Sequence, residues 1–156
     1  RVKSLPLDRQ LSEINGAVNA LIRYVPDTDN YRKLDYWAFP REIIASQRGD
    51  CEDYAILKMA ALHAAGIPSE SMSLVVLQDN RRKLLHAVLT VSTSKGYFVL
   101  DNLRNDVTKD TALGDYQPLY SMSTNRSWLH GVKRSNGLMA SASGSSRNLA
   151  PGTGTE

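Results

Sequence analysis

The spacing of apolar residues changes partway along this chain, from a helical repeat to an alternating one. Up to about residue 65 they recur every three or four residues, and from about residue 73 they alternate with polar ones. The change predicts helices first and strands afterwards, which is an α+β fold with a helix packed on an antiparallel sheet. The first predicted helix is ended by Pro26, and its apolar positions are Leu11, Ile14, Val18, Leu21, Ile22 and Val25.

A second main helix is predicted over residues 51–65. Asp50 is a suitable N-cap with Asp53 three residues later, and Gly66 is a suitable stop. A shorter helical stretch is expected near residues 41–46. The strands are expected at Ser73–Gln78, Leu84–Ser92 and Tyr97–Asp101, joined by turns.

Composition divides the chain into two parts. Residues 1–134 carry the apolar pattern of one folded domain. Residues 135–156 are rich in Ser and Gly and end in Pro-Gly-Thr-Gly-Thr-Glu. Such a segment buries too little apolar area to offset the entropy of ordering it, so we expect a disordered tail.

Charge and hydropathy argue against nucleic-acid and membrane partners. The net charge is +3 over 156 residues, and the basic clusters, at residues 81–83 and 133–134, are short. No apolar run approaches the roughly 20 residues of a membrane-spanning helix, so no membrane insertion is expected. No signal peptide is visible, and a chain starting at Arg1 without methionine is typical of a processed or trimmed product.

Cys51 is the only cysteine in the sequence, so an intramolecular disulfide is excluded. It opens the second predicted helix, where free backbone N–H groups and the helix dipole lower the pKa of a thiol. Its neighbours Asp50 and Glu52 are anionic and raise that pKa. A bound cation, an imidazolium beside the sulfur, or carboxylates pointing away would each resolve this conflict.

His86 and Asp101 follow Cys51 on predicted strands, in the chain order of a Cys-His-Asp triad. Residues that face each other in an antiparallel pair have numbers adding to a constant, and a hairpin loop of even length makes that sum odd. The sum for His86 and Asp101 is odd, so an even loop around residues 93–96 places both side chains on one face of the sheet. An odd loop or a bulge would separate them.

These residues would support nucleophilic attack on a carbonyl carbon through a thioester. Cys51 attacks as an exposed thiolate, His86 protonates the leaving amine, and Asp101 orients the imidazole. The backbone N–H of Cys51 would contribute to an oxyanion hole, with Gln47 or Trp37 as a second donor. Because an exposed thiol buries little area, replacing Cys51 should cost little stability.

Other interpretations remain open from the residues alone. Cys51 would be inert in a packed core, His86 would be structural, and Asp101 would simply end a strand. The same triad also suits a transglutaminase or an amidase, and a degenerate fold would suit a non-catalytic receptor-binding module. We expect structural or lining roles for the remaining histidines and tryptophans, His63, His130, Trp37 and Trp128.

The segment GDCEDYAILK at residues 49–58 resembles the bacterial transglutaminase-like cysteine peptidases, and in particular their LapG-like periplasmic members. The resemblance covers nearly all of residues 10–130 and continues at Asp35-Tyr36-Trp37, Pro40, Leu85–Leu89, Val99–Leu103, Leu119–Ser121 and Trp128-Leu129. It implies a papain-like/transglutaminase-like core whose catalytic helix packs on the sheet. It also implies that Cys51, His86 and Asp101 are the catalytic residues.

The same resemblance implies a metal and a biological setting. In LapG-like members the acidic residues beside the cysteine bind Ca²⁺, and here these would be Asp50 and Glu52, with Asp53 a further candidate. Such enzymes are periplasmic cysteine endopeptidases that cleave a large cell-surface adhesin. An inner-membrane cyclic-di-GMP receptor can sequester them, which links the cleavage to biofilm control.

Overall fold

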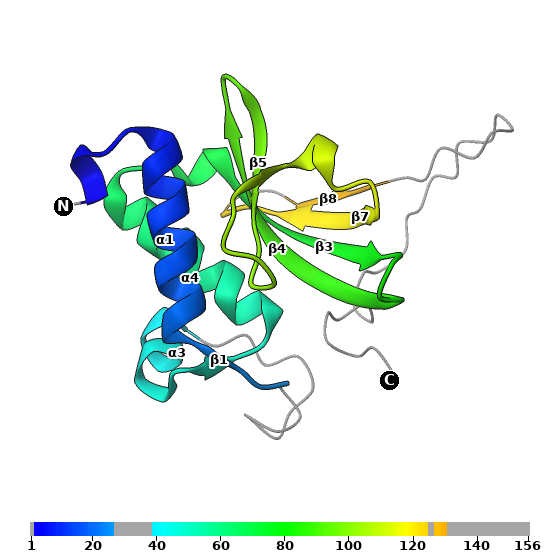
Figure 1. Ribbon diagram of the computed structural model, residues 1–156, viewed down its shortest axis with the longest axis horizontal. Helices are drawn as coiled ribbons and strands as arrows, with labels where there is room; N and C mark the ends of the chain where they lie inside the picture. The colour runs from blue at the N-terminus through cyan, green and yellow to red at the C-terminus, as the bar shows by residue number, and fades with distance from the viewer. Residues whose placement is uncertain (1, 27–38, 125–126, 131–156) are drawn as a thin grey trace, which may run out of the picture.

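The computed structural model describes residues 2–26, 39–124 and 127–130, in which helices pack against a six-stranded antiparallel sheet (Figure 1). The helices are α1 (Leu7–Leu21), α3 (Pro40–Ser46) and α4 (Cys51–Ala65), with 3-10 turns η1 (Val2–Ser4), η2 (Ser69–Ser71) and η3 (Asp110–Ala112). The strands are β1 (Arg23–Tyr24), β2 (Arg48–Gly49), β3 (Met72–Asp79), β4 (Leu84–Thr93), β5 (Gly96–Leu100), β6 (Thr108–Lys109), β7 (Tyr116–Met122) and β8 (Ser127–Leu129). The predicted tail and the boundary after residue 134 lie outside the described residues.

Helix α4 begins and ends where the sequence predicts. The Asp50 side chain accepts hydrogen bonds from the backbone N–H groups of Glu52 (3.1 Å) and Asp53 (3.5 Å). Asp53 Oδ2 in turn accepts one from the backbone N–H of Asp50 (3.3 Å), which completes a capping box. At the other end Gly66 adopts the left-handed conformation (φ 106°) that a helix stop of this kind requires. The predictions for α4 and for α3 are therefore confirmed.

Helix α1 ends earlier than the sequence predicts. It runs from Leu7 to Leu21, and Ile22 is already extended, so the prediction that Ile22 and Val25 lie in the helix is wrong. The chain continues from Ile22 into β1, which pairs in parallel with β2. The Arg23 N–H donates to Gln47 O and the Val25 N–H to Gly49 O, both at 2.9 Å. These bonds place β1 beside the segment that leads into α4.

The strand order in the sheet is β6-β5-β4-β3-β7-β8. The three predicted strands are present as β3, β4 and β5, and they form consecutive antiparallel hairpins. Strand β7, which the sequence did not reveal, returns to the other side of β3. The α+β class with an antiparallel sheet is confirmed.

The two faces of the sheet have separate apolar clusters. Ala87, Leu89 and Val91 of β4 belong to the larger cluster, which includes buried residues of α1 and α4. Helix α4 contacts β3 and β4, and α1 packs beside α4 (Figure 1). Val88 belongs to a smaller cluster on the opposite face, and His86 shares its side of the strand. None of the described helices is long and apolar enough to cross a membrane.

Candidate active site

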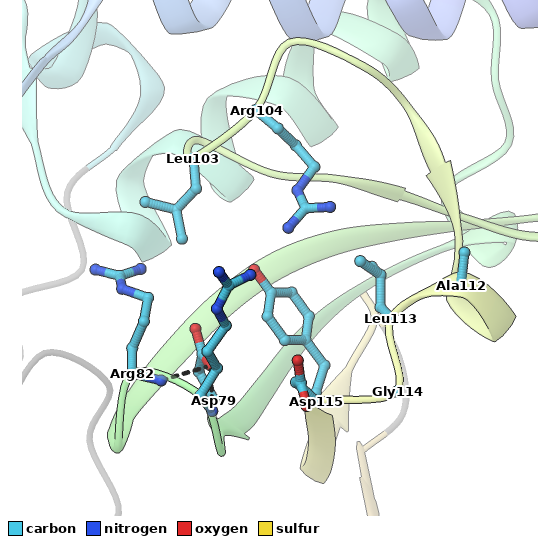
Figure 2. A pocket seen from close by; sticks show the side chains of 10 residues that line it. Asp79, Arg82, Leu103, Arg104, Ala112, Leu113, Gly114 and Asp115 are labelled. Carbon is cyan, nitrogen blue, oxygen red and sulfur yellow. Dashed lines mark hydrogen bonds between the residues drawn. The ribbon is translucent and has the colours of Figure 1, made fainter.

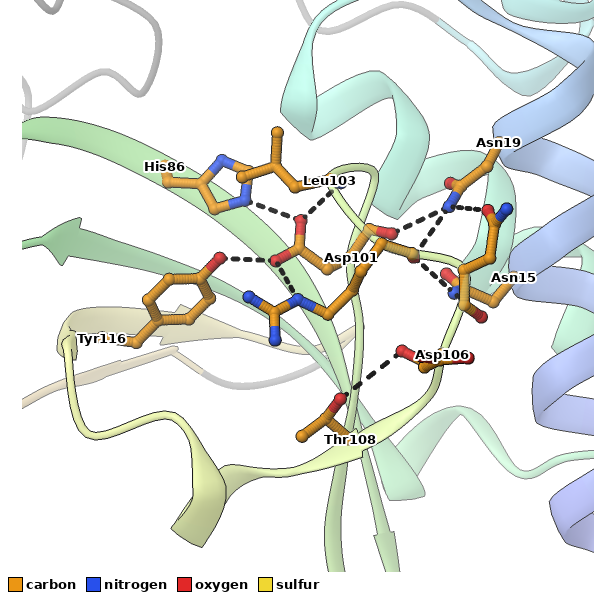
Figure 3. A network of polar contacts seen from close by, with 10 residues as sticks. Asn15, Asn19, His86, Asp101, Leu103, Asp106, Thr108 and Tyr116 are labelled. Carbon is orange, nitrogen blue, oxygen red and sulfur yellow. Dashed lines mark hydrogen bonds and ion pairs between the residues drawn. The ribbon is translucent and has the colours of Figure 1, made fainter. Parts of the chain in front are cut away.

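His86 and Asp101 meet on one face of the β4–β5 hairpin. Thr93 pairs with Gly96, which leaves a two-residue loop of the even length required by the sequence argument. Leu100 pairs with Leu89, so Asp101 lies diagonally across the ladder from His86. His86 Nε2 and Asp101 Oδ1 are 2.8 Å apart, and both side chains are buried (Figure 3).

Asp101 is held by more than the imidazole. Its Oδ1 also accepts the backbone N–H of Leu103 (3.0 Å), its Oδ2 accepts the hydroxyl of Tyr116 (2.7 Å), and Arg104 Nε lies 3.9 Å from Oδ2. Burial raises the pKa of this carboxyl, but the hydrogen bond and charge of His86 and the other two donors outweigh it and lower the pKa to about 2. Asp101 is therefore an anionic acceptor at neutral pH and fixes the orientation of the imidazole.

Tyr116 is a site residue that sequence reasoning missed. Besides its bond to Asp101, its ring meets that of His86 edge-on, with 5.8 Å between centroids and 70° between planes. Burial and the Asp101 carboxylate raise the pKa of its hydroxyl, so it remains a donor. It is one of seven tyrosines and lies on the unpredicted strand β7, so no sequence signal distinguished it.

Cys51 is the first residue of α4 and is 3% exposed, so the expectation of an exposed thiol is wrong. Its sulfur interacts with the backbone N–H of Ala87, the residue that follows His86 on β4. The thiol donates a hydrogen bond to Glu52 Oε2 (3.1 Å). The fold thus brings Cys51 beside the backbone of Ala87 on β4, with the thiol proton directed to Glu52.

The flanking carboxylates face the sulfur instead of pointing away. Burial raises the pKa of the Cys51 thiol well above its usual value, and Glu52 and Asp50 raise it further. Burial, followed by the Asp50 charge, also raises the pKa of Glu52, to about 10. The sequence left three ways to reconcile a Cys51 thiolate with its anionic neighbours, and the structure excludes one of them, namely carboxylates that point away from the sulfur. An added positive charge is what this cluster requires to carry a thiolate.

The donor set beside Cys51 fits a hard cation. One ligand atom from each of Asp50, Cys51 and Glu52 lies within 4.8 Å of the other two. Glu52 Oε1 is buried and has no hydrogen-bond partner within the part of the chain that the structure describes. Carboxylate oxygens at this density suit Ca²⁺, whereas the sulfur does not. Asp53 is not part of this group, because its Oδ2 is directed to the cap of α4.

Gln47 and Trp37 were the two candidates for the second oxyanion donor, and the structure describes only Gln47. Gln47 adopts a left-handed conformation (φ 52°) at the end of α3, where its backbone N–H donates to Ile43 O and its carbonyl accepts the N–H of Arg23. It is exposed. Trp37 lies outside the described residues. The backbone N–H of Cys51 keeps the position at the helix start that the sequence indicated.

Comparison with known proteins agrees with this geometry. The family model described as bacterial transglutaminase-like cysteine proteinase matches residues 5–133. The chain belongs to this family. It is accordingly a cysteine peptidase of the transglutaminase-like type.

Solved structures support the same fold. Legionella pneumophila LapG is 32% identical over 82% of this chain and 71% of its own, with a TM-score of 0.74, and its calcium-bound structure gives the same values. Its EGTA-treated structure is 32% identical over 82% of this chain and 69% of its own, with a TM-score of 0.73. No curated protein matches the sequence. The transglutaminase-like fold implied by the sequence is thereby confirmed.

Proposed function

We propose that Cys51, His86 and Asp101 form the catalytic triad of an endopeptidase that cleaves protein chains. The buried 2.8 Å contact between His86 and Asp101 carries the proposal, because it orients the His86 imidazole. The next residue on the strand, Ala87, contacts the Cys51 sulfur through its backbone N–H. A cysteine peptidase also requires a thiol, and Cys51 is the only cysteine in this sequence.

The steps follow from these positions. The Cys51 thiolate attacks the scissile carbonyl carbon, and the developing oxyanion accepts the backbone N–H of Cys51. As the C–N bond breaks, His86 passes a proton to the leaving amine and a thioester remains. A water molecule, deprotonated by His86, then attacks the thioester, releases the new carboxyl end and regenerates the thiol. Asp101 keeps the imidazole oriented throughout.

We further propose that Asp50 and Glu52 hold Ca²⁺, and that Asp53, the third acidic candidate of the sequence, caps α4 instead. The support is the unpartnered Glu52 oxygen, the buried carboxylate pair, and the likeness to LapG, of which calcium-bound and EGTA-treated structures are known. When bound, the ion supplies the positive charge that lowers the pKa values of Cys51 and Glu52.

The biological setting is proposed on the likeness to LapG. We place the peptidase domain at residues 1–134, and we propose that the protein acts in the periplasm. Its substrate would be a large surface adhesin and its regulator an inner-membrane cyclic-di-GMP receptor, within biofilm control.

The rate at which iodoacetamide alkylates Cys51, measured against pH with calcium present, tests the triad. Wild type should react well below the pH of about 8.5 at which a free thiol ionises, and His86→Ala should lose this reactivity. His63→Ala is the matched control, because His63 is an exposed histidine at the far end of α4, and it should react like wild type. If all three react only near the free-thiol pKa, the triad assignment is wrong.

The same assay tests the metal. EGTA should slow alkylation of wild type at neutral pH, and calcium should restore it. Glu52→Gln keeps the shape but removes the charge, so it should abolish the response to calcium. If calcium affinity in isothermal titration is unchanged in this variant, Glu52 is not a ligand.

A further inference from the structure

A half-open cavity of about 540 Å³ lies next to the His86–Asp101 pair (Figure 2). It is formed by the β3–β4 turn, the loop after β5 and the segment that enters β7. Its polar lining consists of three arginines, two aspartates and one tyrosine, namely Arg81, Arg82, Arg104, Asp79, Asp115 and Tyr116. We call it the arginine pocket.

The arginine pocket is one side chain away from the proposed general base. Tyr116 forms part of its wall, and the same ring is 5.8 Å from the His86 ring and bonded to Asp101. The Arg104 guanidinium lies over the Tyr116 ring at 5.9 Å from its centroid. Because an extended peptide advances about 3.3 Å per residue, a side chain one to three positions from the scissile bond can reach this space.

The arginines are available to a ligand. Asp79 is buried, and its Oδ1 accepts the backbone N–H groups of Arg81 and Arg82, each at 3.0 Å, so it stabilises the turn. Neither Arg81 nor Arg82 forms an ion pair with a carboxylate among the described residues, and Arg104 approaches Asp101 only at 3.9 Å. Figure 2 shows Arg82 and Arg104 reaching into the pocket from opposite sides.

The charge of the pocket selects the chemistry of its occupant. Three guanidinium groups against two carboxylates leave a net positive charge. Guanidinium groups bind carboxylates through paired, charge-assisted hydrogen bonds, and their planar shape reduces the entropy lost for each bond. Apolar side chains would leave these groups without partners, and cationic ones would be repelled.

We propose that the arginine pocket is a substrate subsite that binds the carboxylate of an Asp or Glu side chain close to the scissile bond. The inference rests on the proposed endopeptidase function and adds a preference for acidic substrate segments. Arg81, Arg82 and Arg104 bind the acidic side chain, and Tyr116 links that subsite to the catalytic pair.

The preference can be measured by cleavage of a proteome-derived peptide library, read by mass spectrometry. Asp and Glu should be enriched within three residues of the cleaved bond. A matched peptide pair with Glu or Gln at the enriched position, capped as acetyl and amide, then has that side chain as its only possible carboxylate. We expect kcat/KM to be about tenfold or more higher for the Glu peptide, as charge-assisted bonds imply.

Two double variants complete this test. Arg81→Gln/Arg82→Gln should bring the Glu peptide to the kcat/KM of the Gln peptide. Lys3→Gln/Lys95→Gln removes the same charge from exposed positions outside the pocket and should preserve the ratio. A library without acidic enrichment, or a ratio that falls equally in both variants, would overturn the subsite.

A binding measurement separates this inference from the endopeptidase proposal. Acetyl-glutamyl amide is titrated into ¹⁵N-labelled Cys51→Ala protein while the arginine Nε–Hε signals are followed. Saturable shifts of the pocket arginines, absent with acetyl-glutaminyl amide, are expected whether or not the wild type cleaves peptides. Identical responses to both compounds would sink the subsite and leave the triad untouched. Selective shifts without any cleavage by wild type would sink the triad and leave the subsite.

Discussion

Lys58 lies on α4 two turns after Cys51 and is 0% exposed. Its Nζ has no hydrogen-bond partner within the described ranges and lies 5.7 Å from the centroid of the Tyr54 ring. Burial lowers the pKa of this amine to about 7, although the charge of Asp101 acts in the opposite direction. This buried amine therefore costs stability whenever it is protonated.

Comparing the stability of Lys58→Met and wild type at different pH values should reveal that cost. From about pH 7 to 10.5 the folded amine is neutral while the unfolded one still binds a proton, so the stability of wild type rises by roughly 1.4 kcal/mol per pH unit. Below pH 7 both states are protonated and the penalty is constant. The variant should be more stable than wild type at pH 7, and its advantage should shrink as pH rises towards 10.

Urea unfolding of both proteins at several pH values measures this difference. Other titrating groups are common to the two proteins and cancel. A gap that stays constant with pH would mean that the pKa of Lys58 is not lowered in the folded state.

The individual residues were predictable to different degrees. Cys51, His86 and Asp101 could be proposed as candidates because a lone cysteine, a strand histidine and the parity of a hairpin are local properties. The burial of Cys51 and Lys58 was not, because it depends on which elements cover α4. Tyr116 acquires its role only through the pairing of β7 with β3.

At the scale of elements, the junction between β2 and α4 determines how Cys51, the proposed nucleophile, is positioned. A Cβ added at Gly49 would lie 2.5 Å from Asp53 Cβ and 2.6 Å from Asp53 Oδ2. Only glycine therefore leaves room for the Asp53 carboxylate to reach the Asp50 N–H. The start of the helix that carries Cys51 depends on this close approach.

Gly49→Ala should displace Asp53 and open the capping box. We expect a loss of about 1–2 kcal/mol in the free energy of unfolding, as for a lost N-cap, together with a lower alkylation rate of Cys51. Gly114→Ala is the control, because a Cβ there meets no atom within 4 Å. Equal stability of the two variants in urea would show that the crowding at Gly49 is relieved without harm to the cap.

The elements that the sequence predicted carry strong local signals, and the others do not. Helix α4 has its cap and its glycine stop, and β3 to β5 alternate clearly. Strand β7 contains Pro118, a residue that argues against a strand, and it is tolerated here where the register with β3 shifts between Val76 and Leu77. The end of α1 is set by the parallel pairing of β1 with the distant β2, which no local pattern encodes.

At the scale of the whole molecule, α1 supports the loop after β5, which carries Asp101. Asn15 Nδ2 donates to the carbonyls of Arg104 (3.0 Å) and Asn105 (2.9 Å), and Asn19 Nδ2 donates to those of Asp101 and Arg104, both at 3.0 Å (Figure 3). These bonds join α1 to the loop that follows β5. The loop contains the proposed triad carboxylate and one arginine of the pocket.

Asn15→Ala should remove the donor of the Asn105 carbonyl and one of the two donors of the Arg104 carbonyl, and cost about 1–3 kcal/mol of stability. Hydrogen exchange of the Leu103 N–H, which donates to Asp101, should become faster as the loop loosens. Asn80→Ala, at an exposed turn position, should change neither quantity. If the Asn15 variant behaves like the Asn80 variant, the loop is held by other contacts.

The proposed triad is divided between two structural units. His86 and Asp101 belong to one hairpin whose strands are joined by a two-residue loop, whereas Cys51 comes from the helical layer on the sheet. A small slide of that layer would alter the approach of sulfur to imidazole and leave the imidazole–carboxylate geometry unchanged. In such an arrangement, the position of the helical layer on the sheet can change the activity in small steps, while the His86–Asp101 pair keeps its geometry within the sheet.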